Sequence, residues 1–557
     1  MLRAVPPVSD VLLSKVSPAR LSLARPPLFK TCLDVAGTAG LAIAGLCAPT
    51  FWQSSSAIAQ APLDPEIKVG IIQRFGANAK DKIEVKANAG DQLTVKMVHE
   101  AKTETLQTDK LTFDIQPKPL PQPQLSEQLV LSTHRSFESA EDSANQWRAR
   151  GIEVELAQPD TWEVWAKRDV YSIPVVRRML LNNLKAEGYG LPYMKSTVLQ
   201  SVPQAGVVVN FYRYNRDEVE ISGGAKTLLV NGAPYPGKLR LQRNAYGSYT
   251  LVNKVQVEDY LRGVVPHEIG PSAPMAAVEA QTILARTYAL RNLRRFTVDN
   301  YEMCATTQCQ VYFGWKDPVP TADQAIANTR GLVLTYNNEL IDAVYSSTTG
   351  GVTAAFTDVW NGAPRPYLQP VVDSVAGSWN LGQKSLADEK NLRQFIGQKQ
   401  GFNEDGWNYF RWTKTASLKQ LNGDLKKYLS GKQHPLKNFT TIRSMQVVTR
   451  SSGGRIRQLQ VVLDNGQVML EKDEVIRAFA APNSLLCYLD PIAEAGTLTG
   501  YRFTGGGLGH GVGLSQTGSY KLAQIGWNRD KILSFYYPNT QLLPLNRSIT
   551  FWREPQR

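Results

Sequence analysis

The sequence predicts a multi-domain protein of the α+β class. A chain of 557 residues exceeds the usual size of one domain, so about two to four domains are expected. Short runs in which apolar and polar residues alternate recur in the first half of the chain and indicate β-strands. An Ala-rich run at residues 275–290 indicates a helix, and Pro274 suits its first turn. The hydrophobic content of 43% allows a sizeable core.

Residues 1–59 have the features of an export signal. Five basic residues precede an apolar stretch at about residues 35–52, and Ala57-Ile58-Ala59 then supplies a small-x-small cleavage site. An uncleaved membrane anchor is the alternative, although the apolar stretch is of marginal length for a bilayer span. Cleavage would remove five Lys/Arg and two Asp, so the formal charge of +13 would become +10.

The basic charge of an exported chain suits an anionic partner. Export to the periplasm or cell wall excludes nucleic acid, which leaves cell-wall polymers and anionic lipid surfaces as candidate polyanions. Contact with a membrane is expected only through an uncleaved leader. Basic side chains that merely solvate the surface explain much of the excess charge.

Three regions are predicted between the leader and residue 190. Residues 60–116 alternate apolar and polar residues and predict a small β-rich region. Four prolines at every second position predict a semi-rigid, extended linker over residues 117–124. Residues 125–190 predict the order β-α-β-β-α, with a Gly residue ending each helix.

Residues 200–557 are predicted to form one larger α+β domain. Short strands dominate up to residue 265. A stretch at about residues 374–436 is rich in Lys and Gln and predicts an insertion with its own helices.

Glu268 is the candidate catalytic residue. It follows Val264-Val265-Pro266, which we expect to end a strand, and it precedes the Ala-rich helix. Side chains at such junctions lie at the edge of a rigid scaffold, where catalytic groups are common. Burial among these apolar neighbours would raise the pKa of the carboxyl and suit it to general acid catalysis. An exposed, helix-capping glutamate is the alternative.

Three cysteines remain after the leader is removed. Cys304 and Cys309 are close enough in sequence to form a disulfide, and Cys487 is then expected to be a buried free thiol. The first two would also make a soft ligand pair for zinc. No other cofactor is expected.

Two further segments have the composition of ligand-binding turns. Ser346, Ser347 and Thr348 precede a Gly-Gly pair, which suits a turn beside a polar ligand. A serine-hydrolase site is disfavoured because no Gly-x-Ser-x-Gly elbow is present. The nearby Trp360 and Tyr367 are candidates for stacking on a sugar ring, although single aromatic residues more often belong to a core.

The glycine-rich run at residues 505–513 allows the backbone to approach a ligand closely. Nucleotide binding is disfavoured because no Lys follows the glycines. His510 lies within the run, Ser515 suits the N-cap of the following helix, and Gln516 comes next.

Together, these four segments resemble the stage II sporulation protein D / amidase-enhancer family, in the same order and over some 300 residues. The resemblance implies a peptidoglycan lytic transglycosylase that cleaves the bond between N-acetylmuramic acid and N-acetylglucosamine. Glu268 corresponds to the single glutamate of the family, which acts as acid and then as base. Residues 125–190 resemble the sporulation-related repeat (SPOR) domain, which binds glycan strands that lack peptides; a generic ferredoxin-like domain is the alternative.

The resemblance also assigns expected roles to other residues. Arg286 matches the family pattern and would bind a substrate carboxylate, or else form a buried salt bridge. Gln310 and Tyr312 match the family and would contact sugar. The two cysteines occupy zinc-ligand positions of relatives, but the upstream histidine is missing here, so a disulfide is favoured.

Two other functions belong to different classes. Some relatives are amidase enhancers, which would make a cell-wall amidase the partner and leave this chain without catalysis. A passive glycan-binding scaffold, with residues 125–190 as its working part, is the third possibility.

Overall fold

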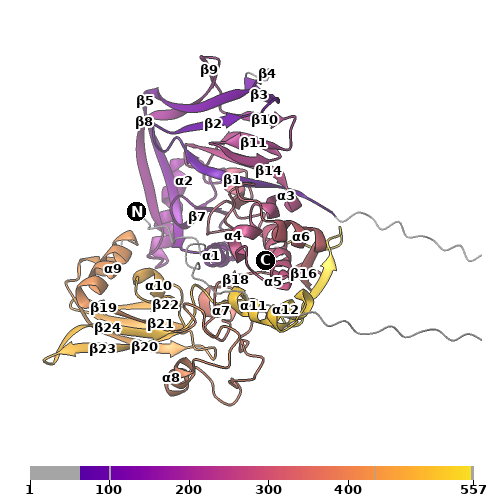
Figure 1. The fold of residues 1–557 in the computed structure, drawn as a ribbon. Coiled ribbons are helices and arrows are strands. Elements are labelled where there is room, and N and C mark those ends of the chain that lie inside the picture. The colour runs from indigo at the N-terminus through magenta and orange to yellow at the C-terminus, as the bar shows by residue number, and fades with distance from the viewer. Residues whose placement is uncertain (1–62, 100–101, 433, 554–557) are drawn as a thin grey trace, which may run out of the picture. The chain divides into compact units, whose positions relative to one another are not determined.

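The computed structural model describes residues 63–99, 102–432 and 434–553 (Figure 1). The predicted export signal at residues 1–59 lies outside these described residues. Strands and helices occur in several separate sheets and helix groups, so the predicted α+β class is confirmed. None of the described helices has both the length and the apolar character needed to cross a bilayer.

Two sheets gather strands from distant parts of the sequence. The first contains β1 Glu66–Phe75, β3 Leu93–His99, β4 Lys102–Thr108, β10 Val219–Gly223, β13 Lys238–Arg243, β14 Tyr249–Gln256 and β15 Met303–Cys304. Its order is β15-β1-β14-β13-β10-β3-β4, and only the β1–β15 pair is parallel. The sheet therefore ties residues 66–75 directly to the segment that leads into Glu268.

The second sheet is built on one very long strand. It contains β2 Lys82–Lys86, β5 Lys110–His134, β6 Val154–Ala157, β7 Trp162–Ala166, β8 Tyr193–Val209, β9 Tyr212–Asn215, β11 Thr227–Val230 and β12 Ala233–Pro236. The main order is β12-β11-β2-β5-β7-β6, and β8 pairs with both β5 and β9. In Figure 1 the β5–β8 pair forms a long two-stranded ribbon.

Two predicted boundaries in this region are wrong. Residues 60–116 do not form a β-rich region of their own, because their strands pair with β10, β11 and β14. Residues 117–124 are not a linker but part of β5, paired with β8 on either side of a register shift. Prolines at every second position direct their missing N–H groups to one edge of a strand, so the other edge can still pair.

The predicted order β-α-β-β-α at residues 125–190 is present. The end of β5 is followed by α1 Phe137–Ala149, then β6, β7 and α2 Pro174–Ala186. Ser136 caps α1 by accepting a hydrogen bond from the Ser139 N–H. The core of this region also includes Phe296 and Tyr301 from beyond residue 190. The region therefore packs against the following domain and shares a core with it.

A group of helices surrounds the long helix α5. It comprises α3 Val257–Arg262, α4 Val265–Ile269, α5 Met275–Arg291, α6 Pro320–Asn328, α11 Gln516–Gln524 and α12 Arg529–Tyr536. Nearly all of α5 from Ala277 onward is buried, because the other five helices and the strand β16 (Leu332–Tyr336) pack around it. The predicted strand end at residues 264–266 is wrong. These residues lie in or next to α4, where Pro266 occupies the first turn without the loss of a hydrogen bond.

The last part of the chain adds smaller sheets and helices. These are β17 Glu339–Leu340, β18 Tyr345–Ser346, α7 Phe356–Val359, α8 Glu389–Gly397, β19 Trp412–Ser417, α9 Leu418–Gly431, β20 Ile442–Arg450, β21 Ile456–Leu463, β22 Gly466–Glu471, α10 Glu474–Ala478, β23 Cys487–Glu494, β24 Thr497–Gly505, β25 Leu514–Ser515 and β26 Gln541–Pro544. The predicted insertion has the expected helices, α8 and α9. Its strand β19 pairs with β24, however, so the insertion is built into the surrounding fold.

Candidate active site

Glu268 lies near the end of α4, which Gly270 terminates with a φ of 81°. Its Oε1 accepts a hydrogen bond of 2.9 Å from the Val311 N–H, and the Tyr345 hydroxyl also bonds to the carboxylate. Burial is the largest influence and raises the pKa of Glu268, while these two hydrogen bonds oppose it; the net shift is upward. No ion pair among the described residues involves Glu268. The group is therefore a single carboxyl that is protonated more readily than an ordinary glutamate.

A chain of neutral hydrogen bonds holds Tyr345 against Glu268. The Tyr260 hydroxyl donates to Gln310 Oε1 over 3.1 Å, and Gln310 Nε2 donates to the Tyr345 hydroxyl over 3.1 Å. Gln310 is almost completely buried. The predicted sugar contact by Gln310 is therefore wrong, because its side-chain amide is buried and hydrogen-bonds to Tyr260 and Tyr345.

Side chains of helix α11 hydrogen-bond to the backbone of Glu268 and Ile269. Gln516 Nε2 donates to the Glu268 carbonyl over 2.8 Å and approaches Gln281 Oε1 at 3.3 Å. The Tyr520 hydroxyl donates to the carbonyl of Ile269. Residues some 250 positions apart in sequence therefore meet at Glu268, and the expected contact of Gln516 with substrate stays a prediction.

The hydroxyl-rich segment and the glycine-rich run lie side by side, since β18 pairs in parallel with β25. Ser346 Oγ accepts a hydrogen bond of 2.9 Å from the Gly511 N–H and lies 3.1 Å from His510 Nδ1. His510 Nδ1 also accepts from the Val512 N–H over 3.0 Å, which assigns the proton of the neutral ring to Nε2. Burial lowers the pKa of His510 to about 4, so the ring is neutral at pH 7.

The other predicted ligand contacts in these segments have protein partners instead. The Ser347 carbonyl accepts from the Thr517 N–H over 3.1 Å, and the Thr348 carbonyl accepts from the Leu508 N–H over 3.1 Å. Ser515 caps α11 by accepting from the Gly518 N–H, as predicted. Thr348 and Ser515 are fully buried, so their predicted direct contact with substrate is wrong.

Sequence reasoning missed a fully buried carboxylate, Glu404, beneath these segments. Its Oε1 accepts hydrogen bonds from the Thr349 N–H (2.6 Å), the Thr349 hydroxyl (3.0 Å) and the Ser515 hydroxyl, and its Oε2 accepts from the Gly351 N–H (2.8 Å). Burial and the charge of Glu404 raise the pKa of the neighbouring Asp373 well above its usual range. The sequence around Glu404 is polar and resembles an exposed turn, so it carries no signal of this burial.

Arg286 is structural. Its side chain is 1% exposed and makes two hydrogen bonds of 2.8 Å to the two carboxylate oxygens of Glu258. The predicted bond to a substrate carboxylate is wrong, and the buried salt bridge is the correct alternative. Glu279, on the same helix, pairs with Arg529 at 3.1 Å.

Tyr312 is also part of the core. Its hydroxyl donates to Asn253 Oδ1 over 2.8 Å, and its ring packs against Tyr235 and Tyr260. The predicted sugar contact is therefore wrong. Trp360 and Tyr367 are buried as well, and Trp360 packs against His510 rather than facing a ligand.

Cys304 and Cys309 form a disulfide, as favoured from the sequence. Cys487 is a buried free thiol whose pKa burial raises to about 12. Among the residues that the structure describes, His, Cys, Asp and Glu nowhere gather in threes in a way that could hold a metal ion.

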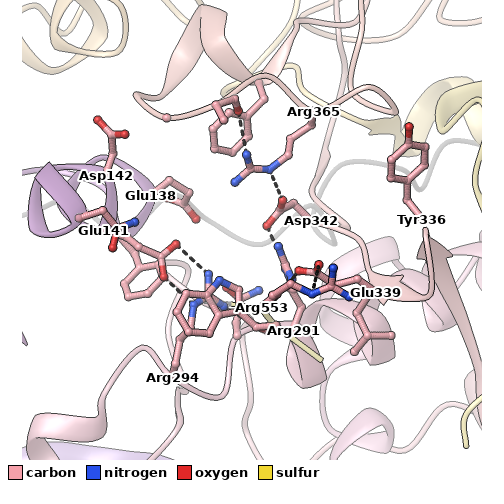
Figure 2. A pocket seen from close by; sticks show the side chains of 18 of the residues that line it. Glu138, Glu141, Asp142, Arg291, Arg294, Tyr336, Glu339, Asp342, Arg365 and Arg553 are labelled. Atoms are coloured by element: carbon pink, nitrogen blue, oxygen red, sulfur yellow. Dashed lines mark hydrogen bonds and ion pairs between the residues drawn. The ribbon is translucent and has the colours of Figure 1, made fainter. Parts of the chain in front are cut away.

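Figure 2 shows a cavity of about 430 Å³ that is lined by α1 and residues 291–294, 336–342 and 361–367. Its charged side chains are largely paired with one another: Arg294 with Glu141, and Arg291 and Arg365 with Asp342. Glu268 is not among the lining residues. These ion pairs join α1 to the core of the larger domain, and we assign the cavity no catalytic role.

Comparison with known proteins places the Glu268 segment in a family. The family model described as Stage II sporulation protein matches residues 245–336, which include Glu268, α5 and the disulfide. Residues 245–336 are therefore similar to the stage II sporulation protein family. A second family model, described as a domain of unknown function (DUF8618), matches residues 354–513 and includes Glu404.

Individual relatives extend the similarity beyond these domains. Stage II sporulation protein D of Bacillus subtilis is 26% identical over 367 residues, which cover 63% of this chain and 91% of that protein. An uncharacterized protein of Brachyspira hyodysenteriae is 28% identical over 325 residues, which cover 57% of this chain and 74% of that protein. The amidase enhancer of Bacillus subtilis is 28% identical over 302 residues, covering 51% of this chain and 40% of that protein.

Proposed function

We propose that the protein is an exported enzyme of cell-wall remodelling, a lytic transglycosylase that cleaves peptidoglycan glycan strands. The single observation behind this proposal is the state of Glu268. It is one partly buried carboxyl whose pKa is raised by burial, held by two neutral hydrogen-bond donors and by no ion pair of the described residues.

One carboxyl suffices for this reaction because the nucleophile belongs to the substrate. Glu268 would donate its proton to the glycosidic oxygen as the bond to C1 of N-acetylmuramic acid breaks. The resulting carboxylate would then accept the proton of the C6 hydroxyl as O6 bonds to C1. The products would be a free 4-hydroxyl and a 1,6-anhydro sugar, and the proton count on Glu268 would be restored. A hydrolase that activates water commonly needs a second carboxylate.

The side chains that hold Glu268 in place are uncharged. The Tyr345 hydroxyl bonds to the carboxyl, while Gln516 Nε2 donates to the backbone carbonyl of Glu268 and lies 3.3 Å from Gln281 Oε1. A pKa that is raised by burial needs an environment without nearby cations, and this one provides it. The strands of the wall, with or without peptides, are the proposed partner, and residues 125–190 are proposed as an additional glycan-binding part.

The proposal is tested by digestion of peptide-stripped glycan with the purified protein, followed by mass spectrometry of the products. Fragments with 1,6-anhydro ends are expected from the wild type and none from Glu268→Gln. Reducing ends without anhydro sugars, or equal product from both proteins, would contradict it.

A second candidate is a non-catalytic role as an amidase enhancer. The similarity to the amidase enhancer of Bacillus subtilis over 302 residues favours it. In this case a cell-wall amidase would be the partner, and Glu268→Gln would stimulate that amidase as well as the wild type does. Release of peptides from sacculi by an amidase, with each protein added in turn, separates the two functions.

A further inference from the structure

Two large exposed aromatic side chains are linked to the Glu268 segment through separate contacts. In the first, the Val311 N–H binds the Glu268 carboxylate, and Phe313 follows two residues later. The Phe313 side chain is 49% exposed, and its ring is edge-on to His267 with 5.1 Å between centroids. His267 directly precedes Glu268, so this aromatic surface begins beside the proposed acid.

The second contact runs through Tyr520. Its hydroxyl donates to the carbonyl of Ile269, the residue after Glu268. The Tyr520 ring lies edge-on to Trp407, with 5.5 Å between centroids and 71° between planes. Trp407 is 40% exposed. A second aromatic surface is therefore fixed to the backbone next to the acid.

Trp407 comes from the predicted insertion, and its loop is anchored beneath the hydroxyl-rich segment. The Trp407 N–H donates to the Glu404 carbonyl over 3.2 Å, and the side chain of Glu404 points inward to Thr349 and Gly351. Tyr409, in the same loop, accepts a hydrogen bond of 2.8 Å from the Gly507 N–H through its carbonyl. One turn thus buries Glu404 while it presents Trp407 and Tyr409 to solvent.

Singly exposed aromatic residues are common on protein surfaces, so exposure alone does not mark a ligand site. Phe313 and Trp407 are distinguished by their contacts with His267, which precedes Glu268, and with Tyr520, which binds the carbonyl of Ile269. The negative face of an aromatic ring attracts the polarised C–H groups on the flat face of a pyranose. The side chains that bond to the Glu268 carboxyl and to its backbone carbonyl, Tyr345 and Gln516, offer hydroxyl and amide groups that suit the substituents of a sugar.

We infer that Phe313 and Trp407 are stacking platforms for two sugar rings of one glycan strand, on either side of the bond that Glu268 acts on. This inference rests on the proposed function and assigns a role to the loop at residues 402–410. That loop forms one wall of the glycan-binding cleft, and Glu404 is a positioning residue that holds the wall in place.

The inference is tested by binding in the Glu268→Gln background, where cleavage does not interfere. The probe is peptide-stripped glycan of defined length, and the dissociation constant is measured by calorimetry. Trp407→Ala and Phe313→Ala should each weaken binding by about tenfold, as loss of an aromatic stacking contact does. Trp407→Tyr should retain most of the affinity. Tyr212→Ala, at an exposed aromatic residue of β9, is the matched control and should bind as the parent does.

Trp407→Leu guards against a folding defect, since it keeps apolar bulk against Tyr520 but has no aromatic face. It should melt like the parent and bind like Trp407→Ala. Unchanged affinity in Trp407→Leu and Phe313→Ala, or no affinity in the parent, would overturn the inference. If the parent binds, both variants lose affinity, and the wild type releases no anhydro sugar, the platforms stand and the proposed catalysis fails.

Discussion

The side-chain amide of Gln516 donates a 2.8 Å hydrogen bond to the backbone carbonyl of Glu268. This bond joins the last of the sequence segments singled out above to the first, across 248 positions of sequence. It fixes α4 against α11, and so fixes the direction in which the Glu268 carboxyl points. The position of the proposed acid therefore depends on a helix near the far end of the chain.

Gln516→Ala should lower the rate of glycan cleavage by about tenfold, because small misplacements of a catalytic group are costly. The free energy of unfolding should fall by only about 1 kcal/mol, the usual net worth of one hydrogen bond. Product release and denaturant unfolding measure the two effects. Gln524→Ala, at an exposed position of the same helix, is the control and should change neither quantity. Equal losses in both variants would contradict a specific role for Gln516.

Arg286→Met should destabilise the fold by about 3–5 kcal/mol, because it leaves the buried Glu258 carboxylate without its partner. Adding Glu258→Leu should recover part of this loss, since no unpaired charge then remains. The KM for glycan should be unchanged in the protein that folds. A raised KM with normal stability would instead restore the expectation that Arg286 binds substrate.

The sequence predicted elements better than it predicted their partners. The order of strands and helices at residues 125–190 follows from local periodicity, and it is present as predicted. The pairing of β1 with β14, of β2 with β11 and of β3 with β10 could not be predicted, because these partners lie more than 100 residues away and local patterning carries no information on them. For the same reason a strand that contains alternate prolines was interpreted as a linker.

Prediction of the candidate site from sequence also succeeded only in part. Glu268 and Gln516 were identified because relatives of the family carry them in recognisable segments, and the structure brings the two together. Arg286, Gln310 and Tyr312 lie in the same segments but are buried, and sequence similarity does not distinguish a residue that touches the ligand from one that supports the site. Glu404 and Trp407 lie in a polar stretch without periodicity, so only the fold reveals that one is buried and the other exposed.

Glu404→Gln should destabilise the fold by about 2–4 kcal/mol, because both carboxylate oxygens accept hydrogen bonds from backbone N–H groups and glutamine has only one accepting oxygen. The NH₂ group of glutamine would face a backbone N–H with no acceptor. Asp405→Asn is the matched control: its carboxylate accepts from the N–H groups of Gly401 and Phe402 but is exposed, so a smaller loss is expected. Denaturant unfolding of both variants gives the comparison. Similar losses would contradict a central role for Glu404.

The raised pKa of Glu268 and the lowered pKa of His510 make stability change with pH in opposite directions. The carboxyl is protonated more readily in the folded state than in the unfolded state, so its contribution to stability is present below about pH 4.5 and is lost as the pH rises through the folded pKa. The pKa of His510 is lowered to about 4, so its contribution is present above pH 6.5 and is lost as the pH falls toward 4.

Comparison of Glu268→Gln with the wild type isolates the first effect, because both proteins contain His510. The glutamine stays neutral at every pH, so the variant should melt at an increasingly higher temperature than the wild type as the pH rises above about 4.5. Over the same range the wild type should lose glycan cleavage, since only the protonated carboxyl can donate to the leaving oxygen. Thermal melts and product release across pH 4–8 measure both. A melting difference that is constant with pH, or that grows toward acid, would show that the folded protein does not raise the pKa of Glu268, and the proposed acid would lose its physical basis.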